Sequence, residues 1–413
     1  MVPNGWLKTT FGKVTEIGNG QVDPKLEPYS SMVHIGPENV VSHTGQLTKL
    51  KSCSELGLIS GKYEFDENSI VYSKIRPNLN KVCKPEFKGV CSADMYPIWA
   101  KNEVDIDYLQ HYMLGPQFNR VAIAMSMRTG MPKINRSDLN SLSLILPPKL
   151  EQRKIAKILS TWDKAISTAE KLIETSKQQK KALMQQLLTG KKRLVNPETG
   201  KAFEGEWEEV RLSELGHTFT GLTGKTKEDF GSGAKYIPYI NIFNNSSVNT
   251  AKLEKVLVDS GEKQNTVQYG DVFFTTSSET PDEVGMSSVM LSEPEEPVYL
   301  NSFCFGFRPN DTTTIAPEFM QYLLRSSQVR RSISVLAQGA TRYNLSKVQL
   351  LKINLLLPTS VEQKKIASVL TAADKEIKVL ETELAHFKQE KKALMQQLLT
   401  GKRRVKVDEE VAA

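Results

Sequence analysis

The strongest constraint on this chain is a long internal repeat. The segment Lys177–Lys191 returns as Lys388–Lys402, and of its fifteen positions only Gln179, which becomes Glu390, differs. The same offset of 211 residues extends upstream, so that about forty residues repeat without a gap. A repeat of this length and spacing indicates two copies of one structural element within a single chain.

Each copy has the pattern of a long helix. Apolar residues recur in alternating steps of four and three, the 3.5-residue period of a left-handed coiled coil. Pro147–Pro148 precedes the first copy, a capping-box pattern at Thr359–Glu362 precedes the second, and a glycine follows each. We therefore predict spacer-helix segments over 148–190 and 358–402, each with a helix of about 38 residues that spans roughly 57 Å at ~1.5 Å per residue. The predicted seam consists of Ile155, Leu159, Trp162, Ile166, Ile173, Leu183, Leu187, Ile366, Leu370, Ile377, Leu380, Leu384, Phe387, Leu394 and Leu398.

Two arrangements can bury such stripes. The helices can assemble with other chains as an oligomerisation element, or they can pair within the chain as an antiparallel spacer between globular domains. Lys180 and Lys391 interrupt the apolar line at equivalent positions. A lysine there can extend its charged end to solvent, or the seam can open at that point to admit helices of a partner.

The rest of the chain divides around these helices. A first globular domain is predicted over 1–147, a linker over 191–206, a second globular domain over 207–357 and a tail over 403–413. Short β-like runs mix with helical runs in both domains, which predicts an α+β or α/β fold. A chain of 413 residues has room for two or three domains of ordinary size.

The two globular stretches also resemble each other. Their predicted framework matches pair Ser69–Ser73 with Asp271–Thr275 and Asp107–Gln110 with Glu318–Gln321. A third match, at an offset of 209, pairs Gly130, Asn135 and Ser137 with Gly339, Asn344 and Ser346.

Composition narrows the class of protein. Charged residues make up 24% of the chain and hydrophobic residues 39%, as in a soluble globular protein. No apolar run has membrane-spanning length and the N-terminus lacks a signal-peptide core, so we expect a cytoplasmic protein. The net charge of +7 favours a polyanionic partner.

The four cysteines predict no metal site. Cys53, Cys83, Cys91 and Cys304 form no C-x-x-C pair, and no histidine cluster joins them. We expect reduced, half-buried thiols.

The order of these segments resembles a known family. A globular domain is followed by a helix that carries Glu-Gln-x-x-Ile-Ala near its start and Leu-Met-Gln-Gln-Leu-Leu-Thr-Gly-Lys at its end, and both then recur. This arrangement, over essentially the whole chain, is similar to the specificity subunit of a type I DNA restriction–modification system. The resemblance implies two target-recognition domains, each recognising one half of a bipartite double-stranded DNA site, on antiparallel helices that set the spacer.

The resemblance also implies the partners. Two adenine-N6 methyltransferase subunits would dock on the helices, and ATP-dependent restriction subunits would join through them. We expect the docking surface at the nearly identical helix ends, with Lys181, Met184, Gln185, Leu188, Lys392, Met395, Gln396 and Leu399 as candidates.

No motif in the chain indicates catalysis or a cofactor. Gly221–Thr226 lacks the first glycine of a Walker A loop, since Phe219 stands at that position, and no methyltransferase Asn/Asp-Pro-Pro-aromatic tetrapeptide occurs. The five histidines are scattered along the chain. We therefore predict a non-catalytic subunit without metal or cofactor. The alternatives are a coiled-coil adaptor that binds only proteins and a self-contained methyltransferase.

In the first domain, loops with basic and amide side chains are the candidates for DNA contact. Arginine pairs with guanine, and asparagine or glutamine with adenine, through two hydrogen bonds in the major groove. A weaker candidate loop is Gly18–Gln21. The candidate residues are Lys74, Arg76, Asn78, Asn80, Lys81, Arg128, Thr129, Lys133, Asn135 and Arg136.

The second domain has fewer arginines in its candidate loops and more threonine, serine and asparagine. The segment around Gly221–Thr226 is expected to be a flexible loop that contacts phosphates and base edges. The candidates are Thr220, Thr223, Lys225, Thr226, Lys227, Asn241, Asn244, Asn245, Thr275, Ser277, Gln338, Thr341, Arg342 and Tyr343.

Overall fold

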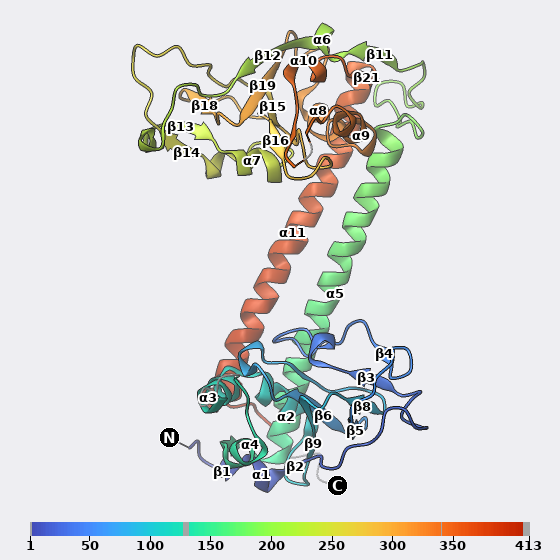
Figure 1. The fold of residues 1–413 in the computed structure, drawn as a ribbon, viewed down its shortest axis with the longest axis vertical. Helices are drawn as coiled ribbons and strands as arrows, with labels where there is room; N and C mark the ends of the chain where they lie inside the picture. Colours follow the sequence, from blue (N-terminus) through green and yellow to red (C-terminus); the bar gives the residue numbers. More distant parts are fainter. Residues whose placement is uncertain (1, 127–131, 340, 408–413) are drawn as a thin grey trace. The chain divides into compact units, whose positions relative to one another are not determined.

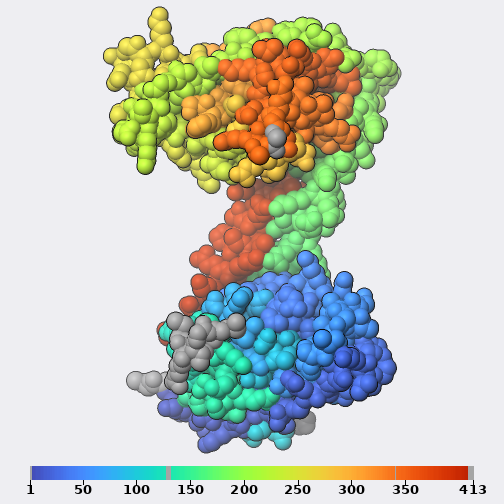
Figure 2. All heavy atoms as spheres, in the orientation of Figure 1, coloured from blue at the N-terminus to red at the C-terminus, as the bar shows by residue number. Residues whose placement is uncertain are grey.

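The computed structural model describes residues 2–126, 132–339 and 341–407 and divides into two compact units. Unit 1 comprises Met1–Glu170 and Thr382–Ala413, and unit 2 comprises Lys171–Glu381. Each unit therefore holds one globular domain, the first part of one long helix and the last part of the other (Figure 1). Figure 2 shows the same parts with all their atoms.

Domain 1 mixes short helices with short strands, as predicted. Its elements are β1 Leu7–Thr10, α1 Phe11–Val14, β2 Thr15–Ile17, β3 Val33–Ile35, η1 Pro37–Asn39, β4 Lys51–Ser52, β5 Tyr63–Phe65, β6 Ser69–Ser73, η2 Pro77–Leu79, β7 Val82–Cys83, β8 Gly89–Cys91, β9 Met95–Ala100, α2 Ile106–Leu114, α3 Pro116–Ser126, α4 Arg136–Ser141 and β10 Ser143–Leu146.

Domain 2 repeats this order with insertions. Its elements are β11 Glu208–Arg211, α6 Leu212–Leu215, β12 Gly216–Thr220, η3 Lys227–Asp229, β13 Phe230–Ile237, α7 Tyr239–Asn244, η4 Thr250–Lys252, β14 Glu254–Val256, β15 Val272–Thr275, β16 Ser277–Ser278, β17 Ser287–Val289, β18 Val298–Leu300, β19 Cys304–Pro309, α8 Pro317–Leu323, α9 Ser327–Val335, β20 Tyr343–Asn344, α10 Lys347–Leu350 and β21 Asn354–Leu357.

The main sheets of the two domains have the same topology. In domain 1 the strand order is β2-β9-β6-β7, and in domain 2 it is β12-β19-β15-β17, with all neighbours antiparallel. A second sheet in each domain contains one parallel pair, β3 with β8 and β13 with β18. The mixed α+β architecture and its internal repeat are therefore confirmed.

The central strands of the main sheets bury both faces. Successive side chains of a strand point to opposite sides. Ile70 and Tyr72 of β6 lie in the core beside α2 and α3, whereas Val71 lies in a second core cluster. Val272 and Phe274 of β15 lie with α8, and Phe273 lies in another cluster. The predicted match of Ser69–Ser73 with Asp271–Thr275 is therefore confirmed.

The third predicted match is wrong by two residues. Asn135 caps α4, where its Oδ1 accepts a hydrogen bond from the Asp138 N–H at 2.8 Å, and Ser346 is the corresponding first residue before α10. These two residues are 211 apart, the offset of the long helices, whereas the prediction paired Asn135 with Asn344. Asn135 is five positions after Gly130, whereas Ser346 is seven positions after Gly339, so an offset that matches the glycines does not match the helix caps.

The two long helices form where they were predicted. α5 spans Lys149–Leu187 and α11 spans Ser360–Leu398, 39 residues each. Gly190 and Gly401 both have φ of 69°, the left-handed conformation in which glycine avoids the strain of a Cβ atom. The glycine stop signals in the sequence therefore have the expected physical role.

A repeated glutamine joins each helix to its domain. Gln152 accepts a hydrogen bond from the Asp105 N–H at 2.9 Å and donates to the carbonyls of Glu103 and Pro147. Gln363 makes the same three bonds 211 residues later, with Ala316, Thr314 and Pro358. Both side chains are buried, so three satisfied hydrogen bonds explain why this amide recurs at both helix starts.

The predicted seam is only partly a contact between helices. Ile155, Leu159 and Leu398 belong to the core of domain 1, and Leu187, Ile366 and Leu370 belong to the core of domain 2. At these ends, apolar side chains of both helices pack into the core of a globular domain. Away from these cores, Ile166, Ile173 and Ile377 are buried, and the rings of Trp162 and Phe387 meet at 5.9 Å.

The two interrupting lysines form ion pairs, which neither predicted alternative included. Lys391 Nζ lies 2.5 Å from Asp163 in unit 1, and Lys180 Nζ lies 2.5 Å from Asp374 in unit 2. In each unit the lysine is on the ending helix and the aspartate on the beginning helix. With Lys388 bound to Glu170 and Lys177 bound to Glu381, the pairs run in antiparallel register within each unit.

A second reciprocal pair was not predicted from the sequence. Arg193, just after α5, bonds Glu362 at the start of α11 through Nε and an amino group, both at 2.8 Å. Arg404, just after α11, bonds Glu151 at the start of α5 in the same way, at 2.8 and 2.7 Å. Both glutamates are buried, and a fork-shaped contact is the strong form of a charged hydrogen bond. The shared offset of 211 was the only signal in the sequence.

All four cysteines are buried free thiols, more buried than expected, and burial raises their pKa values. Among the described residues, no group of three or more His, Cys, Asp or Glu side chains could hold a metal ion. No helix in the described part of the chain is long and apolar enough to span a membrane.

Candidate nucleic-acid interface

In domain 1 two of the predicted DNA-contact loops lie side by side. The Arg76 N–H donates to the Pro132 carbonyl at 2.9 Å, and the Ile134 N–H donates to the Lys74 carbonyl at 2.9 Å. Ile75 and Lys133 face each other as an antiparallel bridge. Segments about sixty residues apart in the chain thus form one narrow ribbon. Arg76, Asn78 and Lys133 are exposed on it.

Several candidate side chains of this ribbon are occupied within the domain, which corrects their predicted role. Lys74 is buried over the Tyr96 ring, and burial lowers its pKa. Asn80 is 1% exposed and donates to the Leu114 carbonyl at 3.0 Å. Lys81 Nζ donates to the Pro37 carbonyl. These groups already have partners, so they stabilise the loop conformation.

The end of the ribbon is also used internally. Asn135 caps α4, and the Arg136 guanidinium donates to the Ile17 carbonyl at 3.1 Å and lies over the Tyr96 ring. Arg128 and Thr129 lie outside the described residues. The exposed candidates of domain 1 are therefore reduced to Arg76, Asn78 and Lys133, with Asn135 exposed but engaged as a cap.

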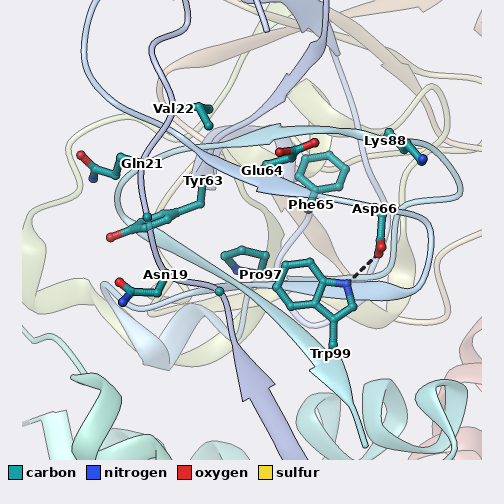
Figure 3. Close-up of a pocket in the computed structure, with 12 residues that line it drawn as sticks. Asn19, Gln21, Val22, Tyr63, Glu64, Phe65, Asp66, Lys88, Pro97 and Trp99 are labelled. Atoms are coloured by element: carbon teal, nitrogen blue, oxygen red, sulfur yellow. Dashed lines mark hydrogen bonds between the residues drawn. The ribbon is translucent and has the colours of Figure 1, made fainter. Parts of the chain in front are cut away.

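The weaker candidate loop, Gly18–Gln21, borders a pocket of about 490 Å³ (Figure 3). Trp99, Tyr63 and Pro97 form apolar walls, and Trp99 Nε1 donates to Asp66 at 2.8 Å. Asn19, Gln21, Glu64 and Lys88 contribute polar side chains to the lining. The two carboxylates against one lysine make this pocket a poor site for phosphate. Arg136 contacts the Tyr63 ring, so the pocket adjoins the ribbon.

Domain 2 contains a ribbon of the same construction. β16 and β20 pair antiparallel, with Ser277 opposite Asn344 and Ser278 opposite Tyr343. The Leu345 N–H donates to the Thr276 carbonyl at 2.8 Å, as Ile134 does to Lys74 in domain 1. Both domains therefore bring the segment after a central strand against the segment before a short helix.

The exposed side chains of this second ribbon lie mostly on its later strand. Gln338, Thr341 and Arg342 are exposed, and Tyr343 is half-buried. The Arg342 Nε donates to Ser277 Oγ at 3.2 Å, which positions one edge of the guanidinium. Gln338 and Asn344 exchange backbone hydrogen bonds at 3.1 and 2.8 Å, so Asn344 of β20 pairs with Gln338 as well as with Ser277 of β16.

Other candidates of domain 2 prove to be structural, which corrects their prediction. Thr275 is fully buried, and its Oγ1 accepts from the Met286 N–H at 3.0 Å. Asn241 is buried and bonds the backbone of Asn249 and Lys252. Asn245 donates to the Asn241 carbonyl at 2.8 Å, and Ser277 is 7% exposed. Asn244 remains exposed.

The glycine-containing loop of domain 2 is pinned, contrary to the expected flexibility. Lys225 forms an ion pair with Glu262, and its side chain is 5% exposed. Thr223 bonds Gln264 through its N–H and hydroxyl, Thr220 Oγ1 accepts from Asn265, and Thr226 bonds Asp229. Lys227 is exposed. Only the short η3 follows the loop, so it lacks the helix N-terminus on which a phosphate loop depends.

The repeated helix ends form a second surface with equivalent grooves. In unit 2, Met184, Gln185 and Thr189 line a groove of about 320 Å³ with Arg325–Gln328. In unit 1, Met395, Gln396 and Thr400 line one of about 250 Å³ with Gly115–Gln117. Both grooves join the end of a long helix to the junction of two domain helices.

Some of the docking candidates at the helix ends are exposed, and others are buried. Lys181, Gln185, Lys392 and Gln396 are exposed. Leu188, Met395 and Leu399 are at most 8% exposed, because they pack into the domain cores, and Met184 is half-buried. The three buried side chains therefore cannot contribute much surface to a partner, and the prediction is corrected for them.

Comparisons with known proteins identify the family. Residues 3–177 and 204–389 each match the model of the type I restriction modification DNA specificity domain. The chain belongs to this family. The resemblance stated from the sequence is therefore confirmed, and both matches include a globular domain and much of its long helix.

Individual specificity subunits are also similar to this chain in sequence. The chain is 34% identical over 205 residues to the EcoDI specificity subunit of Escherichia coli, a match that covers 50% of this chain and 43% of that one. It is 29% identical over 327 residues to the MjaVIII specificity subunit of Methanocaldococcus jannaschii, covering 77% and 75%. The prediction of a specificity subunit, in place of a methyltransferase, is confirmed at the level of the family.

Solved structures share the fold. The HsdS subunit of Thermoanaerobacter tengcongensis aligns over 97% of this chain and 98% of its own, with a TM-score of 0.52 and 18% identity. The S subunit of M. genitalium aligns over 96% of each chain, with a TM-score of 0.58 and 15% identity. At these identities the likeness concerns the fold alone.

Proposed function

We propose that each globular domain recognises one half of a bipartite DNA site through its ribbon. The observation that carries this proposal is the repeated pairing of Lys74 with Ile134 and of Thr276 with Leu345. Both domains anchor this ribbon with a buried residue, Ile134 or Leu345, and place different exposed side chains on it. Exposed Arg76, Lys133 and Arg342 supply the donors that bind phosphates and base edges.

We further propose that the long helices set the spacer between the two half-sites. Each helix continues unbroken through the boundary between the units, which falls at Glu170–Lys171 in α5 and Glu381–Thr382 in α11. A helix of 39 residues at ~1.5 Å per residue is about 58 Å long. The ion pairs and arginine–glutamate bonds at both ends oppose sliding of one helix along the other.

The same helices are proposed to dock two methyltransferase subunits, one per groove, and through them ATP-dependent restriction subunits. Both grooves are lined by the same methionine, glutamine and threonine of the repeated helix end, so they offer two similar places for one kind of partner. Exposed Gln185 and Gln396 provide polar contacts at equivalent positions of the two grooves, and half-buried Met184 adds a small apolar contact in unit 2. Catalysis of methyl transfer then resides in those subunits.

A domain exchange tests recognition. Replacing residues 1–147 by the equivalent domain of another family member should change one half of the methylated site, mapped as N6-methyladenine, and leave the other half unchanged. If both halves change, the domains do not act independently. A steep negative slope of log affinity against log salt is expected for the DNA-binding chain. An adaptor that binds only proteins would show no affinity for DNA at all.

A paired insertion tests the spacer. Seven residues inserted after Ala169 and seven after Leu380 preserve the heptad register and lengthen each helix by roughly 10 Å. At about 3.4 Å per base pair, the methylated site should keep both halves and gain up to three base pairs between them. Methylation should weaken, because about three base pairs also rotate one half-site by roughly 100°. An unchanged spacer would show that the helices do not set this distance.

A further inference from the structure

Phe303 has an unusual position for a large apolar residue. It lies in the short loop between β18 and β19 and is 64% exposed. A single exposed apolar side chain is common on protein surfaces and needs no special explanation. Phe303 differs from such residues because its loop lies beside the ribbon of domain 2.

The Phe303 loop adjoins the ribbon of domain 2. The Thr276 N–H donates to the Phe303 carbonyl at 3.0 Å, while the Thr276 carbonyl accepts from the Leu345 N–H. Ser277, the next residue, holds Arg342 and also accepts a hydrogen bond from the Tyr239 hydroxyl at 2.9 Å. The phenylalanine backbone is thus hydrogen-bonded to the segment that pairs with β20, next to the exposed candidate Arg342.

The loop is rigidly held. The Phe303 N–H donates to Asn301 Oδ1 at 2.8 Å, and the Cys304 N–H donates to the Asn301 carbonyl at 3.1 Å. The Asn301 N–H donates to the Ile237 carbonyl, and Gly221 approaches Asn301 so closely that a Cβ there would meet its carbonyl at 2.1 Å. A side chain presented by such a loop loses little backbone entropy when it binds.

Domain 1 shows that the fold does not need a phenylalanine here. Its Lys74 N–H donates to the Asp94 carbonyl at 3.0 Å, the counterpart of the bond from Thr276 to Phe303. Asp94 is exposed, so one domain carries a carboxylate where the other carries an apolar ring. The same backbone position accepts opposite chemistries, so the side chain is free to serve recognition.

We propose that Phe303 packs against bases of the half-site that domain 2 recognises. Aromatic rings contact the methyl group of thymine or stack on a base that has left its neighbours, and neither contact is available from phosphate. Phe303 then adds a sequence-dependent apolar contact to the polar contacts of Arg342. The proposal rests on the proposed function of domain 2 as a DNA reader.

The first test uses the full chain in complex with its methyltransferase subunits and compares target DNA with scrambled DNA. Phe303→Ala should weaken binding to the target about tenfold or more, leaving the affinity for scrambled DNA and the salt slope unchanged. Phe303→Tyr should retain most of the affinity. Val379→Ala, at a side chain that is 65% exposed on α11, is the matched control and should have no effect.

Equal affinity of wild type and Phe303→Ala for the target would overturn the proposal, as would equal losses on both DNAs. Thermal unfolding of each variant verifies the fold, and Phe303→Leu supplies a second variant of similar volume. A wild-type complex that does not distinguish target from scrambled DNA would instead refute the proposed function itself.

The second test locates the contact. Single base pairs of the target are substituted one at a time, and the loss of affinity is measured for the wild type and for Phe303→Ala. At one base pair, the substitution should weaken binding of the wild type and not of the variant. That position should fall in the half-site that changes when domain 2, residues 207–357, is exchanged. Coupling to the half-site of domain 1 would contradict the proposal.

Discussion

Domain 1 places Arg76 and Lys133 on its ribbon where domain 2 places Ser278 and Asn344, although the backbone pairing is the same. The hydrogen bonds of Gln152, by contrast, recur without change in Gln363. Buried groups that join a domain to the repeated helix are kept, whereas exposed ribbon groups differ in charge and size. The two domains therefore share the hydrogen bonds that join them to the long helices and differ in the side chains exposed on their ribbons.

One buried position breaks this pattern. His111 and Tyr322 occupy equivalent places, next to the lysine–aspartate pair of their unit. Tyr322 bonds Asp374 at 2.9 Å and Thr371 at 3.1 Å, whereas His111 bonds Ser160 at 3.1 Å and its Nδ1 lies 3.8 Å from Asp163. The tyrosine reaches the carboxylate directly and the histidine does not. The two units should therefore respond differently to acid.

The largest expected effect comes from opening the arginine–glutamate bonds. Arg193→Ala leaves Glu362 buried without a charged partner, which should destabilise unit 2 by about 3–5 kcal/mol. Arg404→Ala should cost less, because Trp6 Nε1 still donates to Glu151 at 3.2 Å. Urea unfolding of the single variants measures both costs. Equal costs would show that the tryptophan bond does not compensate.

The next effect concerns pH. Burial, together with the nearby Lys391, lowers the pKa of His111 to about 3. Between about pH 6.5 and 3 the unfolded chain gains a proton at this residue that the folded chain does not bind, so stability falls with falling pH. The loss approaches about 1.4 kcal/mol per pH unit below about 6. His111→Tyr, which copies unit 2, should remove this slope in denaturant unfolding measured at pH 5–7. A slope that persists in the variant would assign it to other groups.

The next effect concerns DNA binding, where variants in the two ribbons should affect different half-sites. Arg76→Ala should weaken target binding by about 1–3 kcal/mol and relax selectivity in one half-site, whereas Arg342→Ala should do so in the other. Lys133→Ala should weaken binding to all sequences alike if it contacts phosphate. Competition binding against targets altered in one half at a time distinguishes these outcomes. Loss of selectivity in the same half for both arginines would refute separate recognition.

The smallest effect belongs to the exposed ion pairs. Lys177 with Glu381 and Lys388 with Glu170 are equivalent pairs between well-exposed side chains. Each should contribute less than about 1 kcal/mol, and less still in high salt. Lys177→Ala and Lys388→Ala should therefore shift the urea midpoint slightly and equally. A large shift of the urea midpoint in only one variant would show that these two identical ion pairs contribute differently to the stability of their units.

The sequence predicted the long helices well because their signals are local. A 3.5-residue period, a proline at one end and a glycine at the other act within a few residues, and α5 and α11 begin within two residues of the predicted starts. The long-range repeat further identified the family. At the ends of the apolar line the side chains also lie in the domain cores, because periodicity shows that a face is buried and does not show which surface covers it.

The candidate site was predicted less well, for a different reason. The sequence by itself determined the repeat, the two domains, the helices and which loops carry polar groups. Tertiary structure alone decided which of those groups remain free, because the partners of Asn80 and Lys225 lie more than thirty residues away along the chain. A polar residue forms its hydrogen bonds with whichever group the fold brings near it. The amino-acid sequence does not show directly which distant residues become neighbours in space. Only the tertiary structure shows that the side chains of Arg76, Lys133, Arg342 and Phe303 are exposed.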